Sequence, residues 1–147
     1  MHKLMMAAAL AALPMAAPGL AWAEGVMHKV AVHVDQNNPK VMNMALNNVK
    51  NLQKYYASQG DELTVEVVAY GPGLNMFVKD KSPVSDRIAA MSLELDHVKF
   101  SACGNTHAKM EQKAGHDVPL ISEAEVVPSG VVRLVELQED GYSYVKP

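Results

Sequence analysis

The chain has 147 residues, of which 49% are hydrophobic and 20% are charged, enough for one domain after any leader is removed. Its formal net charge is −3, from 13 basic and 16 acidic residues, and no run of basic side chains is present, which argues against a nucleic-acid partner. Its one cysteine, Cys103, excludes a disulfide within the chain.

The N-terminal segment, residues 1–23, has the pattern of a secretory signal peptide. A short polar start precedes an apolar, alanine-rich run over residues 4–13, and Ala21-Trp22-Ala23 supplies the small-x-small cleavage pattern. We therefore expect export to the periplasm and one mature domain over residues 24–147. The alternative is a retained membrane anchor, but the prolines and alanines make a poor spanning helix, so we expect no stable membrane insertion.

The first half of the mature chain predicts strand, helix and strand. Residues 27–34 are rich in β-branched side chains. Asn38 and Pro39 then form a helix cap and first turn, helical spacing of apolar residues follows, and Gly60 ends the helix. Residues 63–70 predict the second strand, closed by a Gly-Pro-Gly turn.

The second half continues the same alternation. Its expected elements are a short helix at 74–78, a helix at 84–95 opened by Ser82-Pro83, a strand from 98 to the cysteine, a helix at 105–114, a strand at 125–127, a helix at 131–139 capped by Ser129, and an edge strand at 142–145.

This alternation predicts an α/β fold, a three-layer sandwich with a mainly parallel sheet and helices on both faces. In such sheets, the loops that leave the carboxyl ends of the strands share one edge and bind ligands. These loops are residues 35–38, 71–75, 103–107 and 128–130. We expect them to form one rim.

Cys103 lies at the predicted junction between a strand and a helix. Val98, Phe100 and Ala102 alternate with polar residues, as in a strand, and Gly104-Asn105-Thr106 can turn the chain and cap a helix. The N–H groups and partial positive charge of a helix N-terminus favour a thiolate over a thiol. We therefore expect a partly exposed thiolate, which is a nucleophile and a soft metal ligand.

The mature chain resembles the DsrE/DsrF-like family of small α/β sulfur-relay proteins. Two motifs are the most characteristic: Cys103-Gly104-Asn105-Thr106 and the Val-Pro-Ser-Gly-Val-Val turn at 127–132. The remaining similarity is in residues 32–34, 45–52, 65–73, 100–106, 126–132 and 137–142. The resemblance implies the three-layer fold, assembly into trimers or hexamers, and a cysteine that carries sulfur as a persulfide.

On this interpretation, Cys103 accepts sulfur, Asn105 and Thr106 supply hydrogen-bond donors around it, and His107 assists as a thiolate partner. The expected function is a periplasmic sulfur carrier whose partners are sulfur donor and acceptor proteins or small sulfur anions, with no cofactor. The alternative is a non-catalytic, oligomeric ligand- or protein-binding module in which the cysteine is structural.

Three further features have weaker interpretations. Cys103, His107 and Met110 share a helix face and offer copper ligands, but a line of ligands suits a metal poorly, and we expect no metal site. His33, in an apolar strand, is expected to be a hydrogen-bonded core histidine. The cluster Asn47, Asn48 and Asn51 is either an oligomer contact or, by default, a solvated helix face.

Overall fold

Strands and helices alternate from residue 27 to the C-terminus. The computed structural model describes residues 25–147, and the signal-peptide prediction for residues 1–23 lies outside the described residues. The elements are β1 (Met27–Val34), α1 (Pro39–Gln59), β2 (Glu62–Ala69), the 3-10 helix η1 (Gly71–Phe77), α2 (Ser85–Glu94), β3 (Val98–Cys103), α3 (Gly104–Ala114), β4 (Ala124–Val127), α4 (Gly130–Glu139) and β5 (Ser143–Val145).

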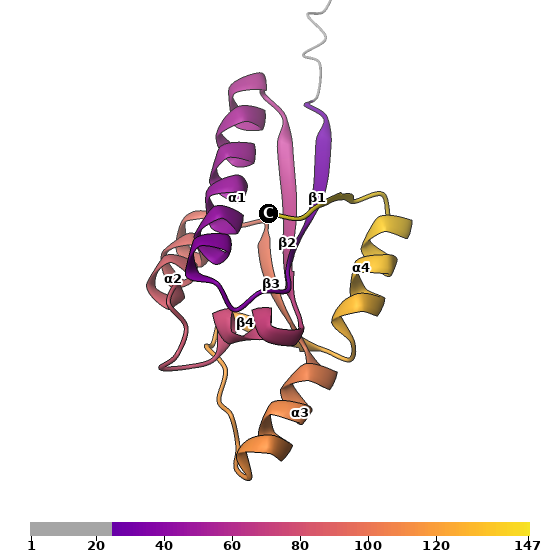
Figure 1. Ribbon diagram of the computed structural model, residues 1–147. Coiled ribbons are helices and arrows are strands. Elements are labelled where there is room, and N and C mark those ends of the chain that lie inside the picture. The colour runs from indigo at the N-terminus through magenta and orange to yellow at the C-terminus, as the bar shows by residue number, and fades with distance from the viewer. Residues whose placement is uncertain (1–24) are drawn as a thin grey trace, which may run out of the picture.

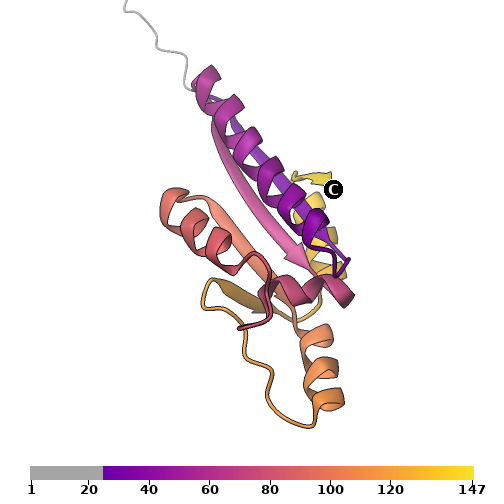
Figure 2. The ribbon, with the colours of Figure 1, turned by 60° about the vertical axis from the view of Figure 1, so that its left-hand side comes forward.

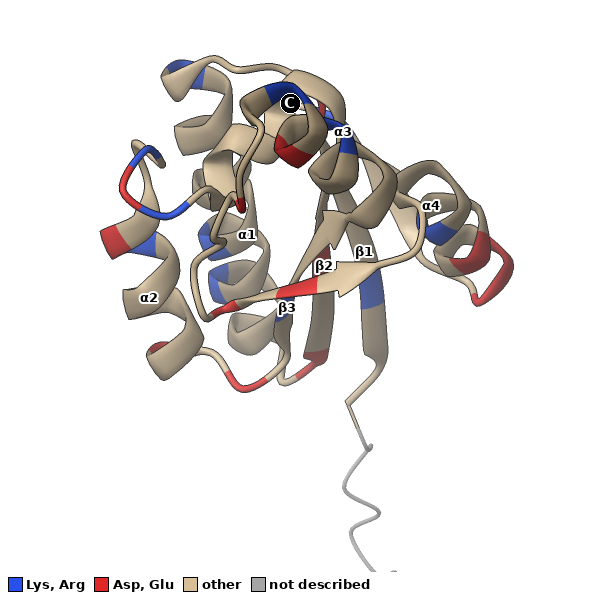
Figure 3. Ribbon diagram, turned by 90° about the horizontal axis from the view of Figure 1, so that it is seen from below, with Lys and Arg blue, Asp and Glu red and all other residues tan. Residues whose placement is uncertain are grey.

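The five strands form one sheet in the order β4-β3-β2-β1-β5, and each of the pairings is parallel. Helices α1 and α2 cover one face and α4 the other, while α3 extends beyond the carboxyl ends of the strands (Figures 1 and 2). Viewed from those ends, the sheet lies between the two helical layers (Figure 3). The predicted α/β sandwich with a parallel sheet and an edge strand at the C-terminus is therefore confirmed.

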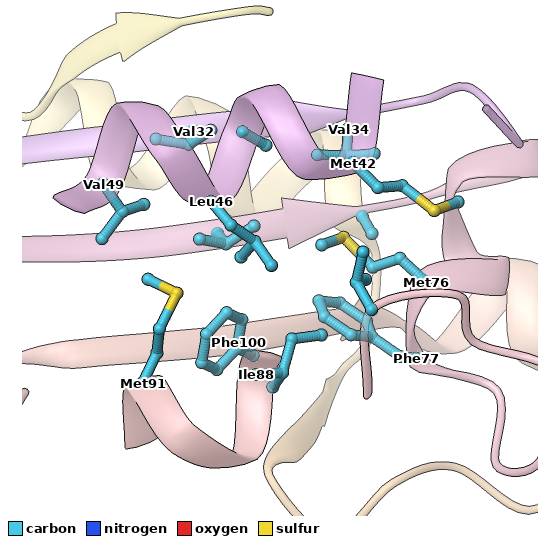
Figure 4. Packing of buried hydrophobic residues seen from close by; sticks show 14 of the residues in the cluster. Val32, Val34, Met42, Leu46, Val49, Met76, Phe77, Ile88, Met91 and Phe100 are labelled. Atoms are coloured by element: carbon cyan, nitrogen blue, oxygen red, sulfur yellow. The ribbon is translucent and has the colours of Figure 1, made fainter. Parts of the chain in front are cut away.

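The two faces of the sheet are packed unequally. On the side of α1 and α2, a large apolar cluster joins side chains such as Leu46 from α1, Met91 from α2 and Phe100 from β3 (Figure 4). The cluster under α4 has four buried members: Ala31, Val68, Leu134 and Leu137. Polar side chains occupy much of the remaining α4 face, and this is where the candidate site lies.

Helix α1 begins and ends where the sequence predicts. The Lys40 N–H donates to Asn38 Oδ1 over 2.9 Å, and Pro39 occupies the first helical position. Gly60 ends the helix with φ of +77°, a left-handed conformation that glycine adopts without a steric penalty.

One predicted boundary and one predicted helix cap are wrong. The Gly-Pro-Gly segment is the first turn of η1 rather than a separate turn before it. Helix α2 begins at Ser85, one residue after the prediction, but Ser82-Pro83 does not open it, because the Ser82 hydroxyl donates to the Met76 carbonyl and accepts from the Val84 N–H, which ties residues 82–84 into a turn. The other strand and helix ends agree with the prediction within one residue.

None of the helices in residues 25–147 has both the length and the hydropathy needed to cross a bilayer.

Candidate functional site

The loops that follow β1, β2, β3 and β4 meet at one edge of the sheet, as predicted. The Asn75 amide donates to Asn37 Oδ1 over 3.0 Å, which joins the first two loops. The Gly71 N–H donates to Thr106 Oγ1 over 2.9 Å, which joins the second loop to the start of α3. Gly130, at the start of α4, lies against Tyr70 and Cys103, which joins the loop after β4 to the ends of β2 and β3.

Cys103 is both the last residue of β3 and the N-cap of α3. It is 4% exposed. A Cβ added to Gly130 would lie 3.1 Å from Cys103 Cβ and 3.0 Å from Tyr70 Cβ, so the absence of a side chain at Gly130 lets α4 start directly over the cysteine. The thiol is thus enclosed by the end of β2, the start of α3 and the start of α4.

The surroundings of Cys103 favour its thiolate. Burial alone would raise the pKa of the thiol, but hydrogen bonding from the Thr106 hydroxyl and from the N–H groups of Gly130, Thr106 and Asn105 outweighs burial and lowers the pKa below its ordinary value. The side chain makes no close capping hydrogen bond within α3, so the stabilisation is shared among several donors. These N–H groups belong to the N-termini of two helices, where the helix dipole also favours an anion.

Thr106 connects two parts of the site through one hydroxyl. Its oxygen accepts the Gly71 N–H, so its own hydrogen remains available to the sulfur. The side chain of Asn105 is exposed, and its backbone N–H is the group that faces the thiol. The structure therefore brings Thr106 to Cys103 by its side chain and Asn105 by its backbone.

His107 points away from the thiol. Its Nε2 donates to the Val118 carbonyl over 2.7 Å and lies 3.5 Å from a carboxylate oxygen of Glu111. His107 therefore anchors the loop after α3, and the structure does not bring it to Cys103 as a thiolate partner.

The expected partial exposure of the cysteine is wrong, because the start of α4 packs against it at Gly130. A cavity of about 290 Å³ lies on the α4 face of the sheet, next to the Glu66, Ser101 and Arg133 side chains. Its lining includes Ser101, Val127, Pro128 and Ser129, which are close neighbours of Cys103 and Gly130 in sequence. Cys103 itself is not among the residues that line this cavity.

The sequence matches the family model described as the DsrE/DsrF-like family over residues 3–147. The chain belongs to the DsrE/DsrF-like family. Sulfur relay is the function associated with this family, which the resemblance in the sequence had indicated.

A solved structure agrees with this membership. The protein of unknown function MTH1491 from Methanobacterium thermoautotrophicum is 30% identical, with a TM-score of 0.68. The match covers 82% of this DsrE/DsrF-like chain and 99% of the other. No curated protein matches the chain.

The ligands of the copper alternative have separate partners in this DsrE/DsrF-like protein. His107 is bound to Val118, and Met110 packs against the large apolar cluster. Within the described part of the chain, no group of three or more His, Cys, Asp and Glu side chains could hold a metal ion.

Sequence reasoning missed a buried polar network on the α4 face. Glu66, 2% exposed, accepts two hydrogen bonds of 2.7 Å from Arg133, one from Nε and one from Nη2. The Ser101 hydroxyl donates to the same carboxylate over 2.6 Å. Burial opposes ionisation of Glu66, but Arg133 and Ser101 outweigh it and lower its pKa. The available signal was a carboxylate flanked by Val65 and Val67 within a strand.

His33 is a hydrogen-bonded core histidine, as predicted. It is 4% exposed, and its Nδ1 lies 2.7 Å from the Tyr144 hydroxyl. Burial lowers its pKa, against the opposing effect of Asp35, so the ring is neutral near pH 7. Its Nε2 and Asp35 Oδ1 are both buried with no hydrogen-bond partner in residues 25–147.

Asn47, Asn48 and Asn51 were predicted to be an oligomer contact or a solvated helix face, and one of them, Asn47, contacts another helix of the same chain. Asn47 accepts a hydrogen bond from Arg87 over 2.8 Å, which links α1 to α2 within one chain.

Proposed function

We propose that this DsrE/DsrF-like protein accepts sulfane sulfur on Cys103, holds it as a persulfide and passes it to an acceptor. The observation that supports this most directly is the meeting of two helix N-termini at the one cysteine of the chain. A thiolate held by N–H donors is both a good nucleophile and a good leaving group. It therefore suits both loading and unloading.

Loading is a displacement at sulfur. The Cys103 thiolate attacks the outer sulfur of a persulfide, polysulfide or thiosulfate donor, and the bond between the donor's two sulfur atoms breaks. The electron pair leaves with the donor as a thiolate, a shortened polysulfide or sulfite. Unloading is the reverse type of step: an acceptor thiolate attacks the outer sulfur, and the Cys103 thiolate leaves. No outside oxidant or reductant is needed in either step.

The donors around Cys103 have a role in each step. The N–H groups of Asn105, Thr106 and Gly130 and the Thr106 hydroxyl stabilise the anion before loading and again as it leaves.

The partners proposed are sulfur donor and acceptor proteins or small sulfur anions, and the compartment proposed is the periplasm. Self-association into a trimer or hexamer is part of the proposal. It is supported by Val131, Val132 and Val135, which are about half exposed on the outer side of α4.

The proposal is tested by incubating residues 24–147 with polysulfide or thiosulfate and measuring the intact mass. We expect one added sulfur atom per chain in the wild type and none in Cys103→Ser. The wild type unfolded in urea serves as a reference, since its thiol is accessible but has lost the helix N-termini. An adduct that forms no faster in the folded protein than in the unfolded one would contradict the proposal.

A second candidate is a non-catalytic binding module in which Cys103 is structural. The 4% exposure of the residue favours it. The two candidates differ in the same experiment, because a structural cysteine acquires no sulfur from any donor while the protein remains folded.

A further inference from the structure

Helix α4 is held to the sheet by few apolar contacts, although its start lies directly over Cys103. Within residues 25–147 it is the only helix on its face (Figure 1). Its buried apolar side chains are Leu134 and Leu137, which pack on Ala31 and Val68. Both leucines lie beyond the first turn, so apolar packing does not by itself fix the N-terminus.

A polar contact lies nearer to that end. Arg133 follows Gly130 by three residues, which is about one helical turn or 4.5 Å along the axis. Its guanidinium makes two parallel hydrogen bonds of 2.7 Å to the Glu66 carboxylate on β2. A two-bond contact of this kind fixes the orientation of the arginine as well as its distance.

The network is also connected to the strand that carries the thiol. The Ser101 hydroxyl donates to Glu66 Oε1 over 2.6 Å, and Ser101 precedes Cys103 by two residues on the same face of β3. Glu66 and Ser101 are 2% and 3% exposed, so both ends of the contact are fixed in the interior. Arg133 therefore connects α4 to buried side chains of β2 and of β3, the strand that ends at Cys103.

We propose that the Glu66–Arg133 pair is a positioning element that holds the N-terminus of α4, and with it the Gly130 N–H, against Cys103. The inference rests on the proposed function, in which this N–H stabilises the reacting thiolate. Glu66, Arg133 and Ser101 are positioning residues, since they act on the sulfur through the placement of α4.

The direction in which Glu66→Gln changes the ionisation of Cys103 distinguishes a positioning role from a direct electrostatic effect. Removal of the Glu66 charge leaves Arg133 with only Glu136, at 3.4 Å, as a carboxylate partner, so the charge on this face becomes more positive, and by charge alone this would make Cys103 ionise more readily. If the pair positions α4, the same change moves Gly130 away and makes Cys103 ionise less readily. Glu66→Gln therefore has opposite outcomes under the two explanations.

The test is the rate of iodoacetamide alkylation of Cys103 between pH 5 and pH 10, whose midpoint reports thiol ionisation. Cys103 is the only cysteine, so the signal has one source. The other charged or titratable side chains on the elements around the thiol include Tyr70 and Glu66 from β2 and its end, Lys99 on β3, His107 in the first turn of α3, Glu125 on β4, and Arg133 and Glu136 on α4. Apart from the substituted residue, these side chains are the same in the wild type and in each variant. A shift in the midpoint therefore reports the ionisation of the Cys103 thiol.

We expect Glu66→Gln and Arg133→Lys to move the midpoint upward and to lower the alkylation rate at pH 6 about twofold to tenfold, the effect of one hydrogen bond to the thiolate. Arg133→Lys keeps the positive charge but cannot make the paired contact, so it remains informative if Glu66→Gln does not fold. The matched control is Arg87→Lys, which alters another arginine contact, to Asn43 and Asn47 on α1, away from the cysteine.

A midpoint that stays unchanged or moves downward in folded Arg133→Lys would overturn the positioning role. A wild-type midpoint at the ordinary value for a free thiol would instead count against the proposed function, so the two failures are distinguishable.

Discussion

Thr106 illustrates how a single side chain unites the site. Its oxygen accepts the N–H of Gly71 at the start of η1, and its hydroxyl hydrogen stabilises the Cys103 thiolate. One residue thus connects the loop after β2 with the loop after β3. Its substitution is expected to affect both the sulfur and the local fold.

We expect Thr106→Val, which preserves the shape of the side chain, to raise the pKa of the Cys103 thiol and to slow its alkylation at pH 6 several-fold. The variant also leaves the Gly71 N–H without its acceptor, so the free energy of unfolding should fall by about 1–3 kcal/mol. Thiolate absorbance during a pH titration and denaturant unfolding measure the two effects. Thr106→Ser retains the hydroxyl and should match the wild type in the titration, and a Thr106→Val thiol that titrates like the wild type would contradict the assignment.

At the residue scale, the position of Cys103 was predictable and its burial was not. The alternation of residues 98–102 ends in turn-forming residues, and this local pattern is enough to indicate a strand-to-helix junction. The cysteine is buried where Gly130, which is distant in sequence, packs against it. The direction of His107 likewise depends on a loop that folds back to present the Val118 carbonyl.

At the scale of the elements, α1 was predictable because its ends carry their own signals. Asn38, Pro39 and Gly60 each act within a few residues of the helix end. Helix α2 lacks such a signal, and its start depends on the contact of Ser82 with Met76 in the preceding η1. Glu66 and Arg133 belong to different elements, so no local pattern could have paired them.

The outer side of α4 leads to a prediction about assembly. Val131, Val132 and Val135 are 56%, 52% and 49% exposed, whereas helix surfaces in water are usually polar. If this side is an interface between copies, the double variant Val131→Glu with Val135→Glu should have a lower mass in light scattering than the wild type.

The control for this prediction is Leu93→Glu. Leu93 is 88% exposed on α2, on the opposite face of the sheet, and its substitution should leave the mass unchanged. A wild type that is monomeric over the whole concentration range would contradict self-association through α4.

At the scale of the whole molecule, the alternation of strands and helices was sufficient for the fold class but not for the order of the strands. Short connections to right-handed helices imply parallel neighbours. The order β4-β3-β2-β1-β5 depends on where the last strand returns, and β5 pairs with β1 across nearly the full length of the chain. This pairing is a long-range contact that no local pattern in the sequence encodes.

The proposed export makes a prediction for the whole chain. Trp22 is the only tryptophan and lies before the expected cleavage point. When the full chain is expressed in a Gram-negative host, the protein from the periplasm should begin at Glu24 and show tyrosine fluorescence without a tryptophan component.

The control is Ala23→Arg, which disrupts the small-x-small pattern and should preserve tryptophan fluorescence in a membrane-retained precursor. Recovery of the wild type from the cytoplasm with Trp22 in place would contradict export.

The enclosure of one thiol by three elements has a consequence for the kinetics of a carrier. With no second cysteine in the chain, a bound sulfur atom cannot be expelled by an internal disulfide. Release therefore requires a collision with another molecule, and its rate should increase in proportion to the acceptor concentration. If Cys103 carries sulfur as proposed, the protein retains it when the acceptor is scarce, and so stores sulfur as well as transferring it.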